Sequence, residues 1–180
     1  MSEHTQTLFE LPTDSDDILL RQFTTEDLQD AKNLFETNKD DFVRGGVWSA
    51  YDVLEKNLND PAHDQNAVKQ LGIWQGNELV GFITSAKEDE SIDEVEIGYG
   101  VDAGKTKKGI ASTALRALTK YEIGQGNDVI AEVDYSNKAS EHVLEKAGYQ
   151  LEMNGRNGRM LYRKLSMTEE NLMRRLQNLM

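Results

Sequence analysis

Two apolar strands, each followed at once by an amphipathic helix, dominate the second half of this 180-residue sequence. The first unit runs from a strand at 95–101 through a glycine-rich turn into a helix that begins near Gly109. The second runs from a strand at 129–133 into a helix that Asn137 caps and Gly148 ends. A strand joined to the next strand by a helix lies parallel to it in the sheet. The pattern therefore predicts a parallel strand pair in the middle of a sheet.

Alternating apolar and polar residues predict an antiparallel meander before this pair and a hairpin after it. Strands are expected at 18–23, 68–74, 79–85, 149–153 and 160–165, with an edge strand at 8–11. Helices are expected from Thr24 or Thr25 through Phe35 and at 49–58, with a loop from Lys39 to Trp48 between them. This order predicts an α+β fold with a mixed central sheet of about seven strands and about four helices.

The chain divides into three expected segments. Residues 1–16 are acidic and are expected to be flexible, and residues 17–165 are expected to form one domain. Residues 166–180 are expected to form an amphipathic helix that Thr168 caps, with an apolar stripe of Leu172, Met173, Leu176 and Leu179. Such a stripe needs a surface to bury against, either the chain's own domain or a second subunit, so a homodimer is a possible assembly.

Charge and residue usage exclude several classes of function. Asp and Glu total 32 against 20 Lys and Arg, and the net charge of −12 repels nucleic acid and anionic lipid. The chain has no cysteine, which excludes disulfides, thiolate nucleophiles and sulfur-ligated zinc. Its histidines, His4, His63 and His142, are too scattered for a metal site. No signal peptide and no membrane-spanning stretch is recognisable, so we expect a cytoplasmic protein that binds neither membrane nor nucleic acid.

The turn after the strand at 95–101 is suited to bind a phosphate. Free backbone N–H groups and the helix dipole make the start of a helix an anion site, and glycines allow close approach. Lys105, Lys107 and Lys108 crowd this helix start, where cations alone are unfavourable by about 0.3–1 kcal/mol each. An anion bound between them would reverse that sign.

Two common phosphate motifs fit this turn poorly. A P-loop that ends in Gly104-Lys105-Thr106 needs a glycine where Tyr99 stands. The dinucleotide pattern that starts at Gly98 reaches Ala103 where it needs its last glycine. A nucleotide-phosphate enzyme that uses Gly104-Lys105-Thr106 remains a weaker alternative.

In another register the turn resembles motif A of the GNAT superfamily of N-acetyltransferases. Thr106, Gly109 and Ala111 stand where that motif has Gln or Arg, then Gly, then Gly or Ala. Thr106 departs from the pattern, so the first anchor is either weaker or compensated by Lys105 and Lys107.

The segment that follows the second strand resembles the other hallmark of the superfamily. Its matching residues, at the spacing of the RimJ/RimL-like branch, are Asn137, Ser140, Val143, Gly148 and Tyr149. Two motifs about 30 residues apart, in the right order, are a specific signal. The resemblance covers roughly Ile18 to Leu165.

The resemblance implies a GNAT-type acyl-CoA N-acyltransferase fold, acetyl-CoA as co-substrate, and no metal. In that family two parted parallel strands, here 95–101 and 129–134, expose N–H groups to the pantetheine arm and the thioester oxygen. The Val101 amide is the implied oxyanion donor. The implied cofactor-binding residues are Tyr99, Val101, Thr106, Lys107, Lys108, Gly109, Ile110, Ala111, Ser112, Asn137 and Lys146.

Catalytic roles follow from the same resemblance. Ser140 corresponds to a serine proposed to protonate the leaving sulfur, with Tyr135 as the fallback acid, and Glu96 to a carboxylate that some relatives use as a base. Each has a structural alternative, because Asn137 and Ser140 suit a helix start and Glu96 suits a solvated strand face. Without cysteine a ping-pong thioester route is excluded, which leaves direct attack in a ternary complex.

The expected acceptor is a primary amine, either a protein N-terminal α-amine or a small molecule. The loop 39–48 and the hairpin 154–159 are expected to set this choice. Asp40 and Asp41 suit a cationic amine or a cap, and Phe42 and Trp48 suit a channel wall or the core. Gly155, Arg156 and Arg159 make the hairpin basic, which favours a peptide terminus with acidic neighbours over a polyamine. A non-catalytic acyl-CoA sensor on the same fold is the alternative.

Overall fold

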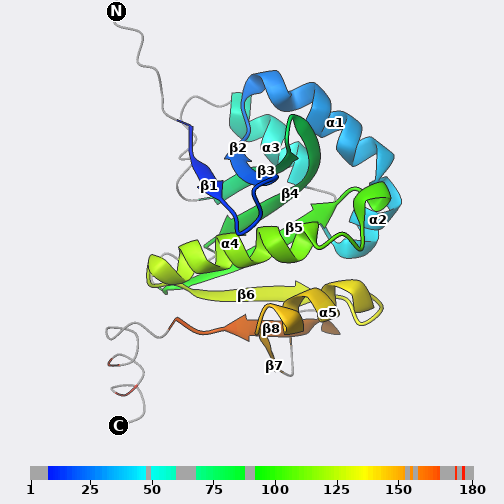
Figure 1. The fold of residues 1–180 in the computed structure, drawn as a ribbon. Helices are drawn as coiled ribbons and strands as arrows, with labels where there is room; N and C mark the ends of the chain where they lie inside the picture. The colour runs from blue at the N-terminus through cyan, green and yellow to red at the C-terminus, as the bar shows by residue number, and fades with distance from the viewer. Residues whose placement is uncertain are drawn as a thin grey trace, which may run out of the picture.

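The computed structural model describes residues 8–47, 50–59, 68–87, 92–152, 155, 158–166, 173 and 176. These residues form an eight-stranded mixed sheet with five α-helices, so the predicted α+β fold is confirmed (Figure 1). The strands are β1 (Glu10–Pro12), β2 (Ile18–Gln22), β3 (Val68–Gln75), β4 (Glu78–Ala86), β5 (Glu94–Val101), β6 (Asp128–Val133), β7 (Gln150–Glu152) and β8 (Met160–Lys164). The helices are α1 (Leu28–Thr37), α2 (Lys39–Gly45), α3 (Ala50–Asn59), α4 (Ile110–Gly124) and α5 (Lys138–Lys146), with 3₁₀ turns η1 (Thr25–Asp27) and η2 (Ala103–Lys105).

The strand order is β1-β2-β3-β4-β5-β6-β8-β7, and β5 and β6 are the parallel pair that the pattern predicts. Their pairing stops at Glu96 and Ile130. Beyond that point β5 continues beside β4 as far as Val101, and β6 continues beside β8 as far as Val133. The two halves of the sheet therefore part in the middle, and Figure 1 shows β5 and β6 diverging toward their carboxyl ends.

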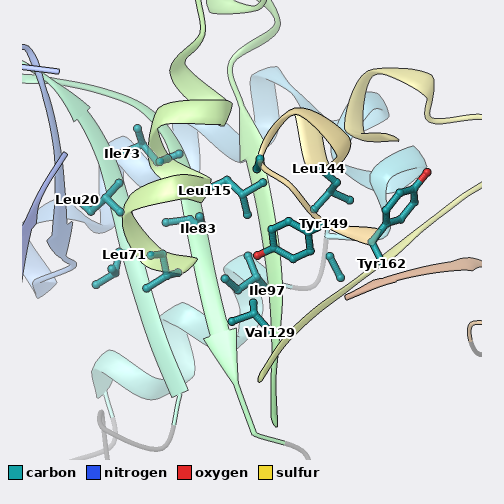
Figure 2. Packing of buried hydrophobic residues seen from close by; sticks show 14 of the residues in the cluster. Leu20, Leu71, Ile73, Ile83, Ile97, Leu115, Val129, Leu144, Tyr149 and Tyr162 are labelled. Carbon is teal, nitrogen blue, oxygen red and sulfur yellow. The ribbon is translucent and has the colours of Figure 1, made fainter. Parts of the chain in front are cut away.

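One face of the sheet is covered by α4 and α5, which share its larger hydrophobic core. Leu115 and Leu118 of α4 and Leu144 of α5 are fully buried. Figure 2 shows Leu115, Leu144 and Tyr149 gathered over the central strands. Burial of one such side chain contributes about 1.5–3 kcal/mol, so this layer holds α4, and the turn before it, firmly on the sheet.

The opposite face carries α1, α2 and α3 on an aromatic cluster. The ring of Phe35 stacks on that of Phe82 at 4.6 Å between centroids, and the ring of Phe42 meets Phe82 edge-on at 5.3 Å. Phe42 lies in α2, so the prediction of a loop from Lys39 to Trp48 is wrong for the part of the chain that the structure describes. Because Phe42 is the single buried side chain of α2, the segment shows no apolar periodicity in the sequence.

The helix α2 is bounded by two residues with special backbone conformations. Asn38 separates it from α1, and Gly46, at φ 77°, ends it in the left-handed conformation that suits glycine. Phe42 is buried in the core, which was one of the two roles expected of it, the other being a channel wall. Trp48 lies outside the described residues.

The smaller elements also follow the expectations. The edge strand predicted at 8–11 is β1, paired with β2, and the final hairpin is β7 with β8. His4, His63, the hairpin residues 154, 156 and 157, and the tail helix apart from Met173 and Leu176 lie outside the described residues. Within the described part of the chain, no helix is long and apolar enough to cross a membrane.

Gly100→Ala should loosen α2. A Cβ on Gly100 would lie 2.7 Å from Cε1 of Phe82 and 2.8 Å from Cε1 of Phe42. Overpacking of this kind costs about 1–3 kcal/mol in the free energy of unfolding, which urea denaturation would measure. Gly98→Ala is the matched control, because its Cβ would meet its nearest neighbour, Thr84 Oγ1, only at 3.3 Å. Equal losses for the two variants would contradict this account of how α2 is held.

Candidate active site

The turn from β5 into α4 is shaped by its own hydrogen bonds. The carboxylate of Asp102 accepts a hydrogen bond from the Gly104 N–H at 2.8 Å, and the Lys105 N–H donates to the Asp102 carbonyl at 2.8 Å. Lys107 and Gly109 follow with φ values of 63° and 81°. The chain thus bends back on itself just before α4 begins.

The first turn of α4 presents free donors. Its first helical hydrogen bond runs from the Thr113 N–H to the Gly109 carbonyl at 2.9 Å. The N–H groups of Ile110, Ala111 and Ser112 therefore have no acceptor within the helix and point out of its end. Nothing lies within 4 Å of a Cβ built on Gly109, so the approach to these donors is open among the described residues. This geometry suits a diphosphate.

The lysines of the turn divide into two groups. The ammonium of Lys105 lies 2.6 Å from the carboxylate of Glu78, so it is directed away from the helix start. Lys107 and Lys108 are exposed, and no described carboxylate pairs with them. Of the two lysines expected to compensate for Thr106, Lys107 is thus the one available. The Thr106 hydroxyl itself donates to the Ala103 carbonyl at 3.0 Å.

The buried side chain of Asn38, which belongs to no recognised motif, holds the turn between β5 and α4 in place. Asn38, 3% exposed, accepts a hydrogen bond from the Ala103 N–H through Oδ1 at 2.8 Å. Its Nδ2 donates to the Leu34 carbonyl at 2.8 Å. Both halves of the amide are satisfied, so Asn38 ties the junction of α1 and α2 to the start of the turn. Its position, between an apolar helix and a polar run, is the only sequence signal for this role.

The parted strands expose backbone donors next to the turn. The Asp102 N–H donates to the Val80 carbonyl in β4 at 2.9 Å. Successive residues of a strand point their N–H groups to opposite sides, so the N–H groups of Val101 and Tyr99 point away from β4, toward β6. Since β6 has left β5 beyond Glu96, these donors face the opening between the strands. Val101 therefore has the geometry expected of an oxyanion donor.

On the face of α4 and α5, Tyr99 and the start of α5 meet. The Tyr99 hydroxyl donates to the Ser140 carbonyl at 3.5 Å, and the Ser140 N–H donates to Oδ1 of Asn137 at 3.1 Å. Asn137 therefore caps α5, which is the structural role that the sequence predicted for it beside cofactor binding. Burial raises the pKa of Tyr99 to about 12, so its hydroxyl stays protonated at neutral pH.

Glu96 lies on the opposite face of β5 from Tyr99. Side chains alternate along a strand, and positions 98 and 100 on the Glu96 side face Val47 and Phe42. The predicted base therefore lies on the α2 side of the sheet, and the predicted acid Ser140 on the α5 side. The opening between β5 and β6 separates them.

Two predicted residues lie apart from this arrangement. Tyr135, 59% exposed, stands in the turn between β6 and α5, and no described contact directs it toward the opening. Lys146 is exposed at the end of α5 opposite Asn137. His142 is exposed on α5 and is not brought to the opening by any described contact.

A cavity of about 350 Å³ lies at the far end of α4, where β5 and β6 are still paired. The carboxylate of Glu122 in its wall accepts hydrogen bonds from the Ser85 hydroxyl at 2.6 Å and from the Asn127 amide at 2.8 Å, and the Lys69 ammonium lies 3.5 Å from it. These groups satisfy one another, so we assign the chemistry to the opening instead. The described residues contain no cluster of side chains suited to hold a metal ion.

The family model of the acetyltransferase (GNAT) domain matches residues 17–150. The chain belongs to this family. Membership makes it an acetyl-CoA-dependent acetyltransferase, as the two motifs predict. No protein of curated function matches the chain in sequence.

Solved structures that share the fold of this GNAT chain include RimL acetyltransferases and an immunity acetyltransferase. RimL, a ribosomal L7/L12 α-N-protein acetyltransferase solved with coenzyme A, is 19% identical with a TM-score of 0.75, over 89% of this chain and 100% of that one. The Salmonella typhimurium acetyltransferase that modifies the N-terminal serine of L7/L12 is 20% identical with a TM-score of 0.72, over 87% and 99%. The microcin C7 self-immunity acetyltransferase MccE, solved with acetyl-CoA and AMP, is 19% identical with a TM-score of 0.69, over 84% and 93%. At 19–20% identity these likenesses show that the chain shares their fold.

Gly109→Ala should separate coenzyme A binding from stability in this GNAT chain. The positive φ costs about 1–2 kcal/mol for a residue with a Cβ, but the surrounding space is open. Gly126→Ala, at φ 91° and also in open space at the other end of α4, carries the same strain and is the matched control. Both variants should lose similar stability in urea, and only Gly109→Ala should weaken coenzyme A binding by calorimetry. Equal affinities would place the diphosphate elsewhere.

Tyr99→Phe should make the protein less sensitive to alkali. The folded pKa of Tyr99, about 12, is above its ordinary value of 10.0, so its contribution to stability is complete below pH 10 and is lost as pH rises through 12. The slope of unfolding free energy against pH in this window should fall by up to about 1.4 kcal/mol per pH unit. An unchanged slope in Tyr99→Phe would contradict the buried placement of the Tyr99 hydroxyl.

Proposed function

We propose that this chain transfers the acetyl group of acetyl-CoA to a primary amine by direct attack in a ternary complex. The acceptor is a protein amino terminus or a small-molecule amine. The observation that carries the proposal is the opening between β5 and β6, which ends beside the free N–H groups at the start of α4. A diphosphate bound there directs the pantetheine arm along the exposed edge of β5.

The chemistry balances without a covalent enzyme intermediate. The amine nitrogen attacks the thioester carbonyl carbon, and the Val101 N–H stabilises the negative charge that forms on the carbonyl oxygen. The carbon–sulfur bond then breaks, and the coenzyme A sulfur takes a proton from the Ser140 hydroxyl, which regains one from water. The amine loses its proton to Glu96, which releases it to solvent. A lysine-type amine, with a pKa near 10.4, needs this base more than an α-amine near 7.7–8.0 does.

Several contacts support these roles. The start of α5 is held by the bond from the Ser140 N–H to Asn137 and by the contact with Tyr99, so Ser140 is fixed in place beside β5. Tyr135 is too exposed to be preferred as the acid. Because Glu96 and Ser140 stand on opposite faces, the amine approaches from the α2 side while the thiolate leaves on the α5 side. The cytoplasmic location and the homodimer stay predictions.

Ser140→Ala should lower kcat about 100-fold or more while acetyl-CoA binding is retained, because general acid catalysis contributes about 10²–10⁴-fold. Turnover is measured as coenzyme A release and as acetylated product by mass spectrometry, over a panel of amines and peptides. Ser136→Ala, whose hydroxyl only bonds Asp134 at 2.6 Å in the preceding turn, is the matched control. Glu96→Gln should lower the rate most at low pH, where unprotonated amine is scarce.

Two outcomes would contradict the proposal. Binding of acetyl-CoA without acetylation of any amine would favour the acyl-CoA sensor. Stabilisation by ATP with magnesium, and none by coenzyme A, would favour a nucleotide-phosphate enzyme.

A further inference from the structure

Arg159, the residue before β8, spans the opening between the two halves of the sheet. Its Nη2 donates to the carbonyl of Gly45, the last residue of α2, at 3.3 Å, and to the carbonyl of Glu132 in β6 at 3.0 Å. The same guanidinium approaches Gly46, where a Cβ would lie 3.0 Å from Nη2. The Arg159 side chain thus joins α2, which packs over β5, to β6, the strand that has separated from β5.

This bridge lies on the face of the sheet that holds Glu96. Val47, two residues after Gly45, covers position 98 of β5, where a Cβ would lie 3.6 Å from Cγ1 of Val47. Glu132 lies two residues beyond Ile130, where the pairing of β6 with β5 ends. The guanidinium therefore stands at the entrance through which the proposed mechanism brings the amine.

The charge of Arg159 is not neutralised by its partners. Both of its hydrogen-bond acceptors are backbone carbonyls, and no described carboxylate lies within ion-pair distance of it. Arg163, on the same strand edge, pairs instead with Glu94 and Glu152. A guanidinium has five N–H donors, and the two bonds of Arg159 use only Nη2, so donors on Nη1 and Nε remain for a ligand.

The charge of Arg159 acts on the carboxylate of Asp134, but only as a minor cause of the shift in its pKa. The pKa of Asp134 is lowered, chiefly by hydrogen bonds from the hydroxyl and the N–H of Ser136, with the charge of Arg159 as a smaller cause. Arg159 therefore acts on Asp134 through space and stays available. In a chain of net charge −12, an arginine that pairs with no carboxylate of the described residues is well placed to attract an anionic group.

We propose that Arg159 determines acceptor specificity by binding a carboxylate carried close to the reacting amine. The inference rests on the proposed function and narrows it. The fitting acceptor is a peptide amino terminus with Asp or Glu in its first positions, or a free amino acid, which carries the same chemistry. A polyamine is disfavoured, because its second ammonium would face the guanidinium.

The test compares peptides that differ only at the second residue, as Asp, Asn or Lys, together with free glutamate. The wild-type protein should acetylate the Asp peptide with a kcat/KM about 10- to 100-fold above that of the Asn peptide, the value of a charge-assisted hydrogen bond. Arg159→Gln should bring this ratio near one, because the rate with the Asp peptide falls far more than the rate with the Asn peptide. Arg159→Glu should favour the Lys peptide. Arg44→Gln is the matched control, since it removes an exposed charge on α2 that pairs with Asp41 at 3.0 Å.

Each outcome decides a different point. Equal rates for Asp and Asn peptides in the wild-type protein overturn the inference and leave the proposed acetyl transfer intact. An unchanged ratio in Arg159→Gln, or an equal loss in Arg44→Gln, also overturns it. Acetylation of no acceptor, with acetyl-CoA bound, overturns the proposed function and the inference together. Because the wild-type ratio is itself decisive, a variant that fails to fold does not remove the test.

Discussion

The separation of β5 from β6 after Glu96 and Ile130 is the constraint on which the rest of the structure depends. Beyond this point each strand stays paired on its outer side, β5 with β4 and β6 with β8, so the sheet stays stable while its centre opens. The donors freed in this way, on Tyr99 and Val101, lie next to the free N–H groups at the start of α4. In the proposed complex, the thioester and the diphosphate would therefore find donors along one continuous edge.

The two faces of the sheet beside the opening carry different side chains, because successive residues of β5 point to opposite faces. Tyr99 joins the face of α4 and α5, where buried side chains and the cap of Asn137 hold Ser140 in position. Glu96 joins the face of α2. The helix α2 is tied at its beginning by Asn38 to the turn, and at its end by Arg159 to β6. One short helix thus connects the turn that we propose holds the cofactor with the opening that we propose admits the acceptor.

The sequence predicted the elements that carry strong periodicity or strong end signals. The parallel pair, the turn before α4, the cap of Asn137 and the final hairpin all follow from local patterns of glycine, asparagine and apolar residues. The helix α2 could not be predicted in this way, because it buries only Phe42 and carries Lys39, Asp40 and Asp41 in its first turn. Its stability comes from contacts of Phe42 with the rings of Phe35, in the preceding helix, and of Phe82, which is distant in sequence.

The candidate site, like the fold, could be predicted only where a local pattern in the sequence marks it. The residues of the turn and of the start of α5 are contiguous in the chain, so motifs could mark them. Asn38 acts through a hydrogen bond from the N–H of Ala103, far along the chain, and such a contact leaves no pattern in the sequence. The basic hairpin marked Arg159, but not its hydrogen bonds to Gly45 and Glu132. The ion pair that turns Lys105 toward Glu78, 27 residues away, was equally invisible.

A crystal structure of the chain with coenzyme A would test the central claim most directly. The account predicts diphosphate oxygens within hydrogen-bond distance of the N–H groups between Lys107 and Ser112, with the pantetheine arm lying between β5 and β6. A coenzyme bound elsewhere, for example in the cavity beside Glu122, would contradict it. So would strands β5 and β6 that pair along their whole length, with no pantetheine arm between them.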